Sequence, residues 1–133
     1  FFNDDWYGFD DAIYSALRMI EILSKTKLTS HEVFNSYPKH FSTPEINLKV
    51  PEEEKFKIID ELKTLINSSG YVLIDIDGIR LESENSWGLI RASNTSPNLV
   101  MRFEGKTKSD LLEIKNYFKE ILSKIEFDLQ LDF

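Results

Sequence analysis

The 133-residue chain contains no cysteine, which excludes a disulfide framework and any catalysis through a thiol. Long apolar runs are also missing, since no stretch approaches the ~20 residues that a membrane-spanning helix needs. Positive charge is scarce: 16 lysine and arginine residues stand against 23 aspartate and glutamate residues, and the net charge is −7. This balance and the lack of a basic stripe argue against nucleic-acid binding. The composition fits one cytoplasmic domain with a small additional segment.

Against this acidic background, one segment carries the parts of an anion-binding site. Residues 89–93 and 99–104 each alternate apolar with other side chains, so both are expected to be strands. The short connection between them indicates an antiparallel hairpin. An arginine lies on each side of that connection, which is rich in hydroxyl and amide side chains.

The apolar pattern also predicts the register of the hairpin. If Ala92 pairs with Leu99, the apolar side chains of both strands share one face of the sheet. Arg91 and Arg102 then lie on the opposite face, one diagonal step apart. A one-residue slip would bury an arginine, so we expect this register rather than its neighbours.

The loop of this hairpin offers several donors to a phosphate group. A guanidinium group matches two phosphate oxygens, Ser93 and Thr95 add hydroxyl groups, and Asn94 adds an amide. Each charge-assisted hydrogen bond contributes on the order of 1.5–3 kcal/mol. Together these groups would hold a phosphate without breaking its ester bond. The spacing fits equally well with a polar hairpin tip and two solvated arginines, because turns favour serine and asparagine.

The loop sequence RASNTSP at residues 91–97 resembles the phosphate-binding loop of the alpha-D-phosphohexomutases, above all the bacterial phosphomannomutase/phosphoglucomutase branch. Residues 8–12 are similar to the segment after that family's sugar-recognition loop. Residues 42–46 resemble the start of its last domain, and residues 77–80 the approach to its phosphate loop. The resemblance therefore covers essentially the whole chain, in the order of the family.

The resemblance implies a four-domain enzyme that moves a phosphate between C1 and C6 of a hexose, through a phosphoserine and a bisphosphorylated intermediate. The serine, magnesium and sugar-loop motifs of its first three domains do not occur in this sequence. We therefore expect residues 1–41 to be the end of the third, sugar-binding domain. Residues 42–133 are expected to be the C-terminal phosphate-binding domain. By itself the chain should be inactive, without a catalytic residue or a metal ligand.

Five residues are expected to hold the substrate phosphate: Arg91, Ser93, Asn94, Thr95 and Arg102. The first four match the family's loop position by position, and the last is added from the strand register. The expected substrate is a mannose or glucose phosphate, because the glucosamine branch carries glycine and glutamate where this chain has Asn94 and Ser96.

The expected partners follow from the same resemblance. The upstream domains of the enzyme would complete the site, with Mg²⁺ and a hexose 1,6-bisphosphate activator in the full-length protein, and neither nucleic acid nor a membrane is expected to bind. The alternative is a non-catalytic module that binds a phospho-ligand, or another protein through its first helix.

Helical periodicity and cap chemistry predict the helices. The first is capped by Asp10 or Asp11, and a short second helix starts at Ser30. The third starts at Pro51, a residue that suits a first helical turn. Its buried stripe is expected to contain four side chains: Phe56, Ile59, Leu62 and Ile66.

Besides the hairpin, strands are expected at residues 45–50, 71–76 and 79–82, and a helix opening at Thr107 ends the domain. The order strand, helix, several strands and helix predicts an α+β domain. The resemblance gives this domain a four-stranded antiparallel sheet with two helices on one face, like a half of the TATA-binding protein. A helical remnant of an α/β domain would precede it.

Three further residues have no assigned partner in the sequence. Arg80 could pair with Asp75 or Asp77, or lie near the phosphate loop. His31 and His40 are interpreted as surface or packing residues, because no suitable partner is near them in the sequence.

Overall fold

The computed structural model describes residues 5–66, 70–127, 129, 131 and 133. The chain divides into two compact units, Phe1–Lys39 and His40–Phe133. The predicted boundary lies two residues later, and the assignment of the first unit to a third, sugar-binding domain stays a prediction. Within the described part of the chain, no helix is long and apolar enough to cross a bilayer.

The first unit contains two helices, α1 (Ala12–Ser24) and α2 (Ser30–Asn35). The carboxylate of Asp11 accepts a hydrogen bond of 2.8 Å from the main chain of Tyr14, which confirms the predicted cap of α1. The second helix begins at the predicted residue, and the capping side chain is that of Thr29. The apolar stripe of α1 is exposed in this chain.

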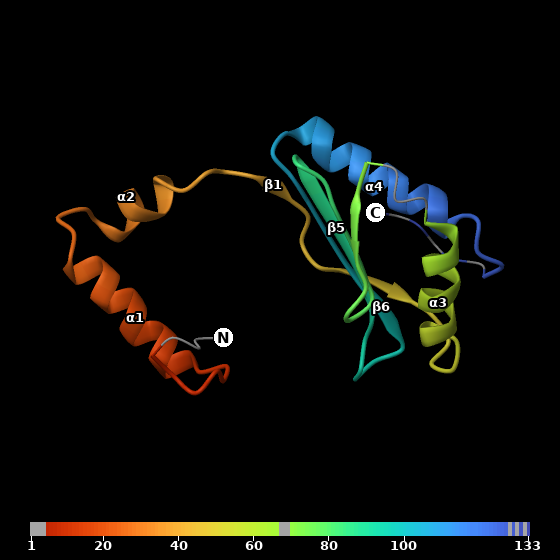
Figure 1. The fold of residues 1–133 in the computed structure, drawn as a ribbon, viewed down its shortest axis with the longest axis horizontal. Helices are drawn as coiled ribbons and strands as arrows, with labels where there is room; N and C mark the ends of the chain where they lie inside the picture. Colours follow the sequence, from red (N-terminus) through yellow and green to blue (C-terminus); the bar gives the residue numbers. More distant parts are fainter. Residues whose placement is uncertain (1–4, 67–69, 128, 130, 132) are drawn as a thin grey trace. The chain divides into compact units, whose positions relative to one another are not determined.

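The second unit is built on one antiparallel sheet (Figure 1). Its strand segments are β1 (Phe41–Ser42), β2 (Ile46–Lys49), β3 (Val72–Ile74), β4 (Ile79–Glu82), β5 (Ser86–Ala92) and β6 (Asn98–Gly105). The order is β1-β6-β5-β4-β3, and β2 also pairs with β6. The α+β class and the antiparallel sheet are confirmed, whereas the expected count of four strands is too low, because the sheet has six segments.

One of the two extra segments arises because one edge of the sheet is interrupted. Both β1 and β2 pair with β6, and between them lies Pro44, which has no N–H to donate. Thr43 bridges the gap. Its main-chain N–H donates to the carbonyl of Phe103 at 3.0 Å, and its hydroxyl accepts from the N–H of Phe103 at 3.2 Å. Residues 41–42, at the predicted boundary between the two parts of the chain, therefore form a short strand.

The hairpin of β5 and β6 has the predicted register. Ala92 lies opposite Leu99, and Ile90 lies opposite Met101. Along β5, buried residues alternate with half-buried ones, so one face of the strand belongs to the core. Arg91 and Arg102 lie on the other face in the predicted diagonal relation, because their cross-strand partners are Val100 and Leu89.

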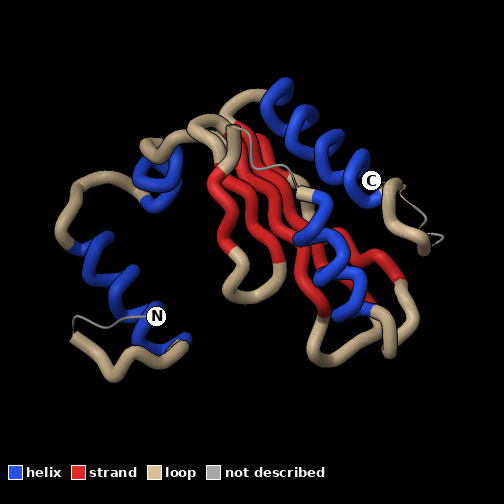
Figure 2. Tube along the Cα trace, turned by 45° about the vertical axis from the view of Figure 1, so that its right-hand side comes forward, coloured by secondary structure: helices blue, strands red, loops and turns tan. Residues whose placement is uncertain are grey.

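Two helices, α3 (Lys55–Leu65) and α4 (Lys108–Leu122), cover the core face. Both pack against β5 and contact one another, and Figure 2 shows them on the same side of the sheet. This confirms the predicted two-helix layer. The described apolar residues of the C-terminal tail also pack against the core: Phe127, Leu129, Leu131 and Phe133.

Helix α3 begins later than predicted. Pro51 opens a turn, closed by a 3.0 Å hydrogen bond from the N–H of Glu54 to the Pro51 carbonyl, and the helix starts only at Lys55. Its buried positions are 55, 58, 59 and 62, an i, i+3, i+4, i+7 stripe. The predicted inward position of Phe56 is therefore wrong: this side chain is 56% exposed. Ile59 and Leu62 are buried as predicted, and Ile66 is half-buried.

Gly88 lets α4 approach the sheet. It lies opposite Phe103 in the hairpin, and the rings of Phe103 and Phe118 meet edge to face with centroids 5.2 Å apart. A Cβ atom at position 88 would lie 2.5 Å from the Phe118 ring. The absence of a side chain here therefore permits the contact between α4 and the centre of the sheet.

Gly88→Ala is expected to lower the free energy of unfolding by about 1–3 kcal/mol, because the added methyl group overpacks this contact. Urea unfolding followed by circular dichroism measures the change. In a Phe118→Leu background the smaller side chain leaves room, so the same substitution should cost less. An equal cost in both backgrounds would contradict the packing explanation.

Candidate functional site

The loop of residues 93–97 joins β5 to β6 at the lower end of the sheet in Figure 1. A hydrogen bond of 2.9 Å from the N–H of Ser93 to the Asn98 carbonyl closes its base. Within the loop, the N–H of Asn98 donates to the Ser96 carbonyl at 2.8 Å. The loop is therefore a tightly turned connection between two paired strands.

Ser93 shapes the loop from inside. Its side chain is buried, and its hydroxyl oxygen accepts hydrogen bonds from the N–H of Thr95 at 3.3 Å and from the N–H of Ser96 at 3.2 Å. The Ser96 hydroxyl donates to the same oxygen at 2.9 Å. The sequence indicated Ser93 only as a donor to a ligand. The structure adds a local role, because three donors already converge on its oxygen.

Asn94 and Thr95 form the exposed tip of the loop. Among the described residues, the structure gives no hydrogen-bond partner to the Asn94 side chain, the Thr95 hydroxyl or the main-chain N–H of Asn94. These groups can donate to an anion without breaking a bond within the protein. The loop therefore uses its inner groups for shape and leaves its outer donors available.

Arg91 lies beside this loop on the open face of the sheet, the face without helices. Its side chain is 36% exposed, and Nη1 lies 3.8 Å from Oδ2 of Asp77 in the β3–β4 turn. That turn is pressed against β5 at Gly78, whose φ is +94° and where a Cβ would lie 2.4 Å from the Ile90 carbonyl oxygen. This turn thus keeps the Asp77 carboxylate beside Arg91. The ion pair is weak, because its N–O distance is long and both side chains are exposed to solvent.

Arg102 lies on the same face, one row farther from the loop than Arg91. It is exposed, and no ion pair is found for it among the residues that the structure describes. Diagonal neighbours on one face are roughly 7–8 Å apart, so a long side chain such as that of Arg102 can reach toward the same ligand. From this position the Arg102 side chain can contribute to the site, but Arg91 lies closer to the loop.

Arg80 has different partners from those expected. Its Nε lies 2.5 Å from Oε1 of Glu82, and its guanidinium carbon lies 4.0 Å from the centroid of the Trp87 ring. Of the alternatives that the sequence left open, pairing with an aspartate of the β3–β4 turn is therefore not the one found. Residues two apart on a strand share a face, and the tryptophan lies across from Glu82, so these contacts require knowledge of the strand pairing.

The sequence interpretation missed two lysines that the fold brings near the loop. Lys49 is exposed on β2, directly across from Asn98, and Lys55 is buried with Nζ 3.4 Å from the Ser96 carbonyl oxygen. The alternation of residues 45–50 could have placed the first on the open face. No local signal could have found the second, because its contact spans 41 residues.

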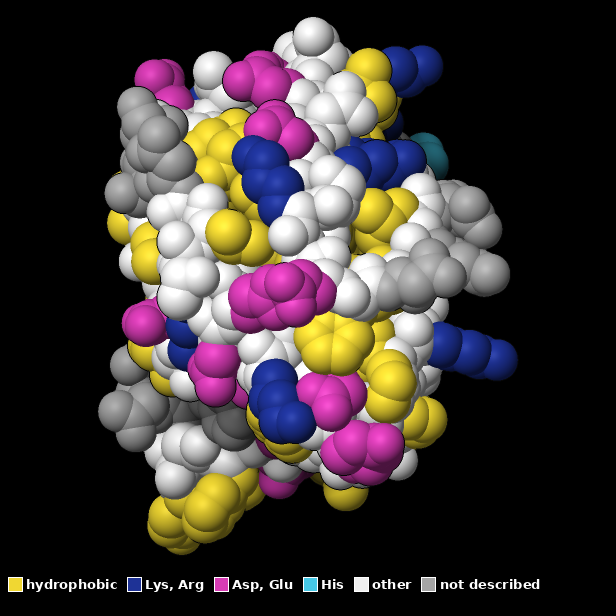
Figure 3. All heavy atoms as spheres, turned by 90° about the vertical axis from the view of Figure 1, so that its right-hand side faces the viewer, with side chains coloured by type: hydrophobic (Ala, Val, Ile, Leu, Met, Phe, Trp, Pro, Cys, Tyr) yellow, Lys and Arg dark blue, Asp and Glu magenta, His cyan; other side chains and the backbone are white. Residues whose placement is uncertain are grey.

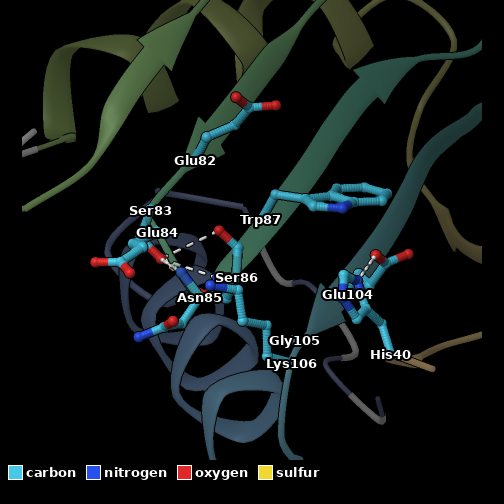
Figure 4. A pocket seen from close by; sticks show the side chains of 10 residues that line it. All are labelled: His40, Glu82, Ser83, Glu84, Asn85, Ser86, Trp87, Glu104, Gly105 and Lys106. Carbon is cyan, nitrogen blue, oxygen red and sulfur yellow. Dashed lines mark hydrogen bonds and ion pairs between the residues drawn. The ribbon is translucent and has the colours of Figure 1, made fainter. Parts of the chain in front are cut away.

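A hollow of about 250 Å³ lies at the opposite end of the hairpin (Figure 4). Glu82, Glu84 and Glu104 line it, with Lys106 and with His40, whose Nδ1 lies 2.8 Å from the carboxylate of Glu104. The excess of carboxylates makes this hollow a poor place for a phosphate. The exposed His40 agrees with the predicted surface role and gains a partner that sequence proximity could not reveal.

The face of the molecule drawn in Figure 3 carries no continuous band of lysine and arginine side chains. On the face shown in Figure 3, basic and acidic side chains are interspersed with apolar ones. The described residues also contain no group of three or more histidine, aspartate or glutamate side chains placed to hold a metal ion. At the loop itself, the guanidinium of Arg91 and the exposed amide and hydroxyl groups of Asn94 and Thr95 are of the kind that can donate to one small anion.

Comparisons with known proteins show the family of this chain and the likeness of its fold. Residues 45–121, more than half of the chain, match the family described as "Phosphoglucomutase/phosphomannomutase, C-terminal domain". The crystal structure of a phosphoglucomutase/phosphomannomutase family protein from Burkholderia thailandensis is similar with a TM-score of 0.79 and 37% identity. The similarity covers 97% of this chain and 27% of that protein.

Curated relatives show the same pattern of coverage. A phosphomannomutase/phosphoglucomutase from Pseudomonas putida is 48% identical over all 133 residues, which are 29% of its length. A phosphoglucomutase from Neisseria meningitidis serogroup A is 44% identical over 124 residues, which are 92% of this chain and 27% of that protein. The chain thus spans less than a third of the relatives it matches, and it belongs to the phosphoglucomutase/phosphomannomutase family, whose C-terminal domain it contains.

Proposed function

We propose that the second unit, residues 40–133, is the phosphate-binding domain of a phosphohexomutase that interconverts hexose 1-phosphate and hexose 6-phosphate. The observation that carries this proposal is the arrangement at the β5–β6 loop. Arg91 stands beside the tip residues Asn94 and Thr95, whose outer donors have no partner among the described residues. A guanidinium fork with amide and hydroxyl donors suits a phosphate dianion.

The four loop residues carry different parts of the task. Arg91 supplies charge and a planar pair of N–H groups, while Asn94 and Thr95 supply neutral donors. Ser93 holds the turn through its oxygen and can donate its hydroxyl hydrogen to the ligand. Arg102 would add electrostatic attraction for the phosphate from a greater distance. Because hydrogen bonds hold the main chain of the loop before the ligand arrives, less conformational entropy is lost on binding.

Holding one phosphate serves a reaction in which the other is transferred. The substrate must reorient between two half-reactions, and a hinged domain that can grip either phosphate permits this by opening and closing. The boundary between the two units, at Lys39 and His40, is a suitable place for a hinge. The proposed substrates are mannose and glucose phosphates, and the upstream domains of the enzyme would provide the reacting groups.

In this proposal, Mg²⁺ is bound by the upstream domains of the enzyme. Mg²⁺ and a hexose 1,6-bisphosphate activator remain proposals for the whole enzyme. The role of this chain in that enzyme is to bind and orient the phosphate that does not react, and by itself it should catalyse no phosphate transfer.

Arg91→Ala should weaken the binding of inorganic phosphate and mannose 1-phosphate to this chain by about ten- to a hundredfold, because a charge-assisted pair of hydrogen bonds is lost. NMR titration of the main-chain amides of residues 91–95 measures the affinity, with unphosphorylated mannose as the ligand control. In the whole enzyme, the same substitution should raise KM and lower kcat.

The matched control is Arg80→Ala, which removes the same charge from the same face of the sheet, at a position where the guanidinium is already engaged by Glu82 and Trp87. It should change the affinity for phosphate by less than about threefold. Equal losses in the two variants would mean that only net charge matters. A wild-type chain that binds neither phosphate ligand would count against the proposed function itself.

Asp77→Asn should strengthen phosphate binding by about two- to fivefold, because the Asp77 carboxylate competes with the ligand for Arg91 and repels its negative charge. The same titration measures the change. Asp75→Asn, in the same turn but without an ion pair among the described residues, is the control and should have a smaller effect. Weaker binding by Asp77→Asn would show that the carboxylate orients Arg91 instead of competing for it.

A further inference from the structure

Lys55 is a charged residue at a buried position of α3, where an apolar residue would be expected. It is the first residue of α3 and the first member of the buried stripe 55, 58, 59 and 62. Its side chain is 2% exposed, although the other three members of the stripe are isoleucine or leucine. Burying an ammonium group is costly unless it finds partners, so its presence requires an explanation.

The stability of α3 does not supply that explanation. The N-terminus of a helix carries partial positive charge, so a cation at the first helical position is unfavourable there. Lys55 pairs with Glu52 at 2.6 Å, but such a pair does not need burial. Lys57 makes the equivalent pair with Glu54 at 3.1 Å while its own side chain is 70% exposed.

The contact that distinguishes Lys55 is the one with the phosphate loop. Nζ lies 3.4 Å from the Ser96 carbonyl oxygen. Among the described residues, no other side chain from outside the β5–β6 hairpin donates to the loop of residues 93–97. The ammonium group therefore connects the start of α3 to the loop, a link between segments 41 residues apart.

A main-chain bond beside it strengthens this connection. The N–H of Val50 donates to the Pro97 carbonyl at 3.0 Å, so residues 96 and 97 are both tied to the corner between β2 and α3. On the other side, the loop is held by the hydroxyl of Ser93. Asn94 and Thr95 lie between these two attachments, and they carry the donors without partners.

We infer that Lys55 is a positioning residue of the phosphate site: its buried ammonium group fixes the Ser96 carbonyl, and thereby the loop conformation in which Asn94 and Thr95 present their donors. This inference rests on the proposed function. Lys55 acts through the loop and does not touch the ligand. Without it, the loop would have to be ordered when phosphate binds, at a cost in affinity.

Lys55→Met tests the inference, because methionine retains the apolar stem and removes the charge and the donors. Lys57→Met is the matched control, since it removes a lysine with the same kind of partner from the same helix. In an NMR titration of the chain with inorganic phosphate, Lys55→Met should weaken binding by about five- to tenfold and Lys57→Met by less than about twofold. Only Lys55→Met should shift the ligand-free amide resonances of Asn94 and Thr95.

Two more variants separate positioning from stability. Lys55→Arg keeps a buried cation with donors and should recover most of the affinity, with loop resonances close to those of the wild type. If thermal unfolding shows that Lys55→Met does not fold, Lys55→Gln replaces it, because the amide keeps one donor for the Ser96 carbonyl and a polar partner for Glu52. Its affinity should lie between those of Lys55→Met and the wild type.

The outcomes distinguish this inference from the proposed function. A wild-type chain that does not bind phosphate would overturn the function. Wild-type binding retained in a folded Lys55→Met or Lys55→Gln chain would overturn the role of Lys55 and leave the function intact. Equal losses in Lys55→Met and Lys57→Met would also overturn it, because the effect would then be one of net charge.

Discussion

The pairing of β5 with β6 in a single register is the constraint on which the rest of this domain depends. The register places Ile90 opposite Met101 in the core, and it places both Arg91 and Arg102 on the open face. A shift by one residue would reverse the two faces, so that an arginine would be buried and an apolar row exposed. The strand pairs that stabilise the core therefore also determine which arginine side chains lie near the loop.

The polar groups of the loop are of two kinds. Some form hydrogen bonds within the protein, and others are exposed to solvent. The Ser93 oxygen and the Ser96 and Pro97 carbonyls are engaged inside the protein. The exposed donors of Asn94 are left for solvent or a ligand. Water can satisfy such donors when no ligand is present, so leaving them open costs little stability, whereas burying them unpaired would be expensive.

Much of this arrangement could be predicted from the sequence, because it follows from local rules. Alternation alone was sufficient for the hairpin register. Cap chemistry restricted the cap of α1 to Asp10 or Asp11, and the structure shows that it is Asp11. The resemblance supplied the family, which the comparisons confirm, whereas the phosphate-binding role and the site residues that it implied remain proposals. The start of α3 was predicted four residues too early, because the local preference of Pro51 for a first turn is overridden by contacts of the 50–55 corner with the distant loop.

Other features needed the tertiary structure. The buried stripe of α3 begins with a lysine. A search for apolar residues at helical spacing passes over a lysine, so the sequence interpretation began the stripe at Phe56 instead. The partners of Arg80 lie across β4 and β5, and that of His40 lies 64 residues away. These contacts depend on which strands become neighbours, a property that no short window of sequence contains.

The interruption of the sheet at Pro44 has a consequence for how the protein behaves among its own copies. The edge formed by β1 and β2 offers an incoming strand only two and then four residues, with a proline between them, and the opposite edge, β3, offers three. Long, regular edges invite strands of other molecules to add on, which leads to aggregation. Here both edges are too short or too broken to act as templates, so the sheet resists growth into fibres by strand addition.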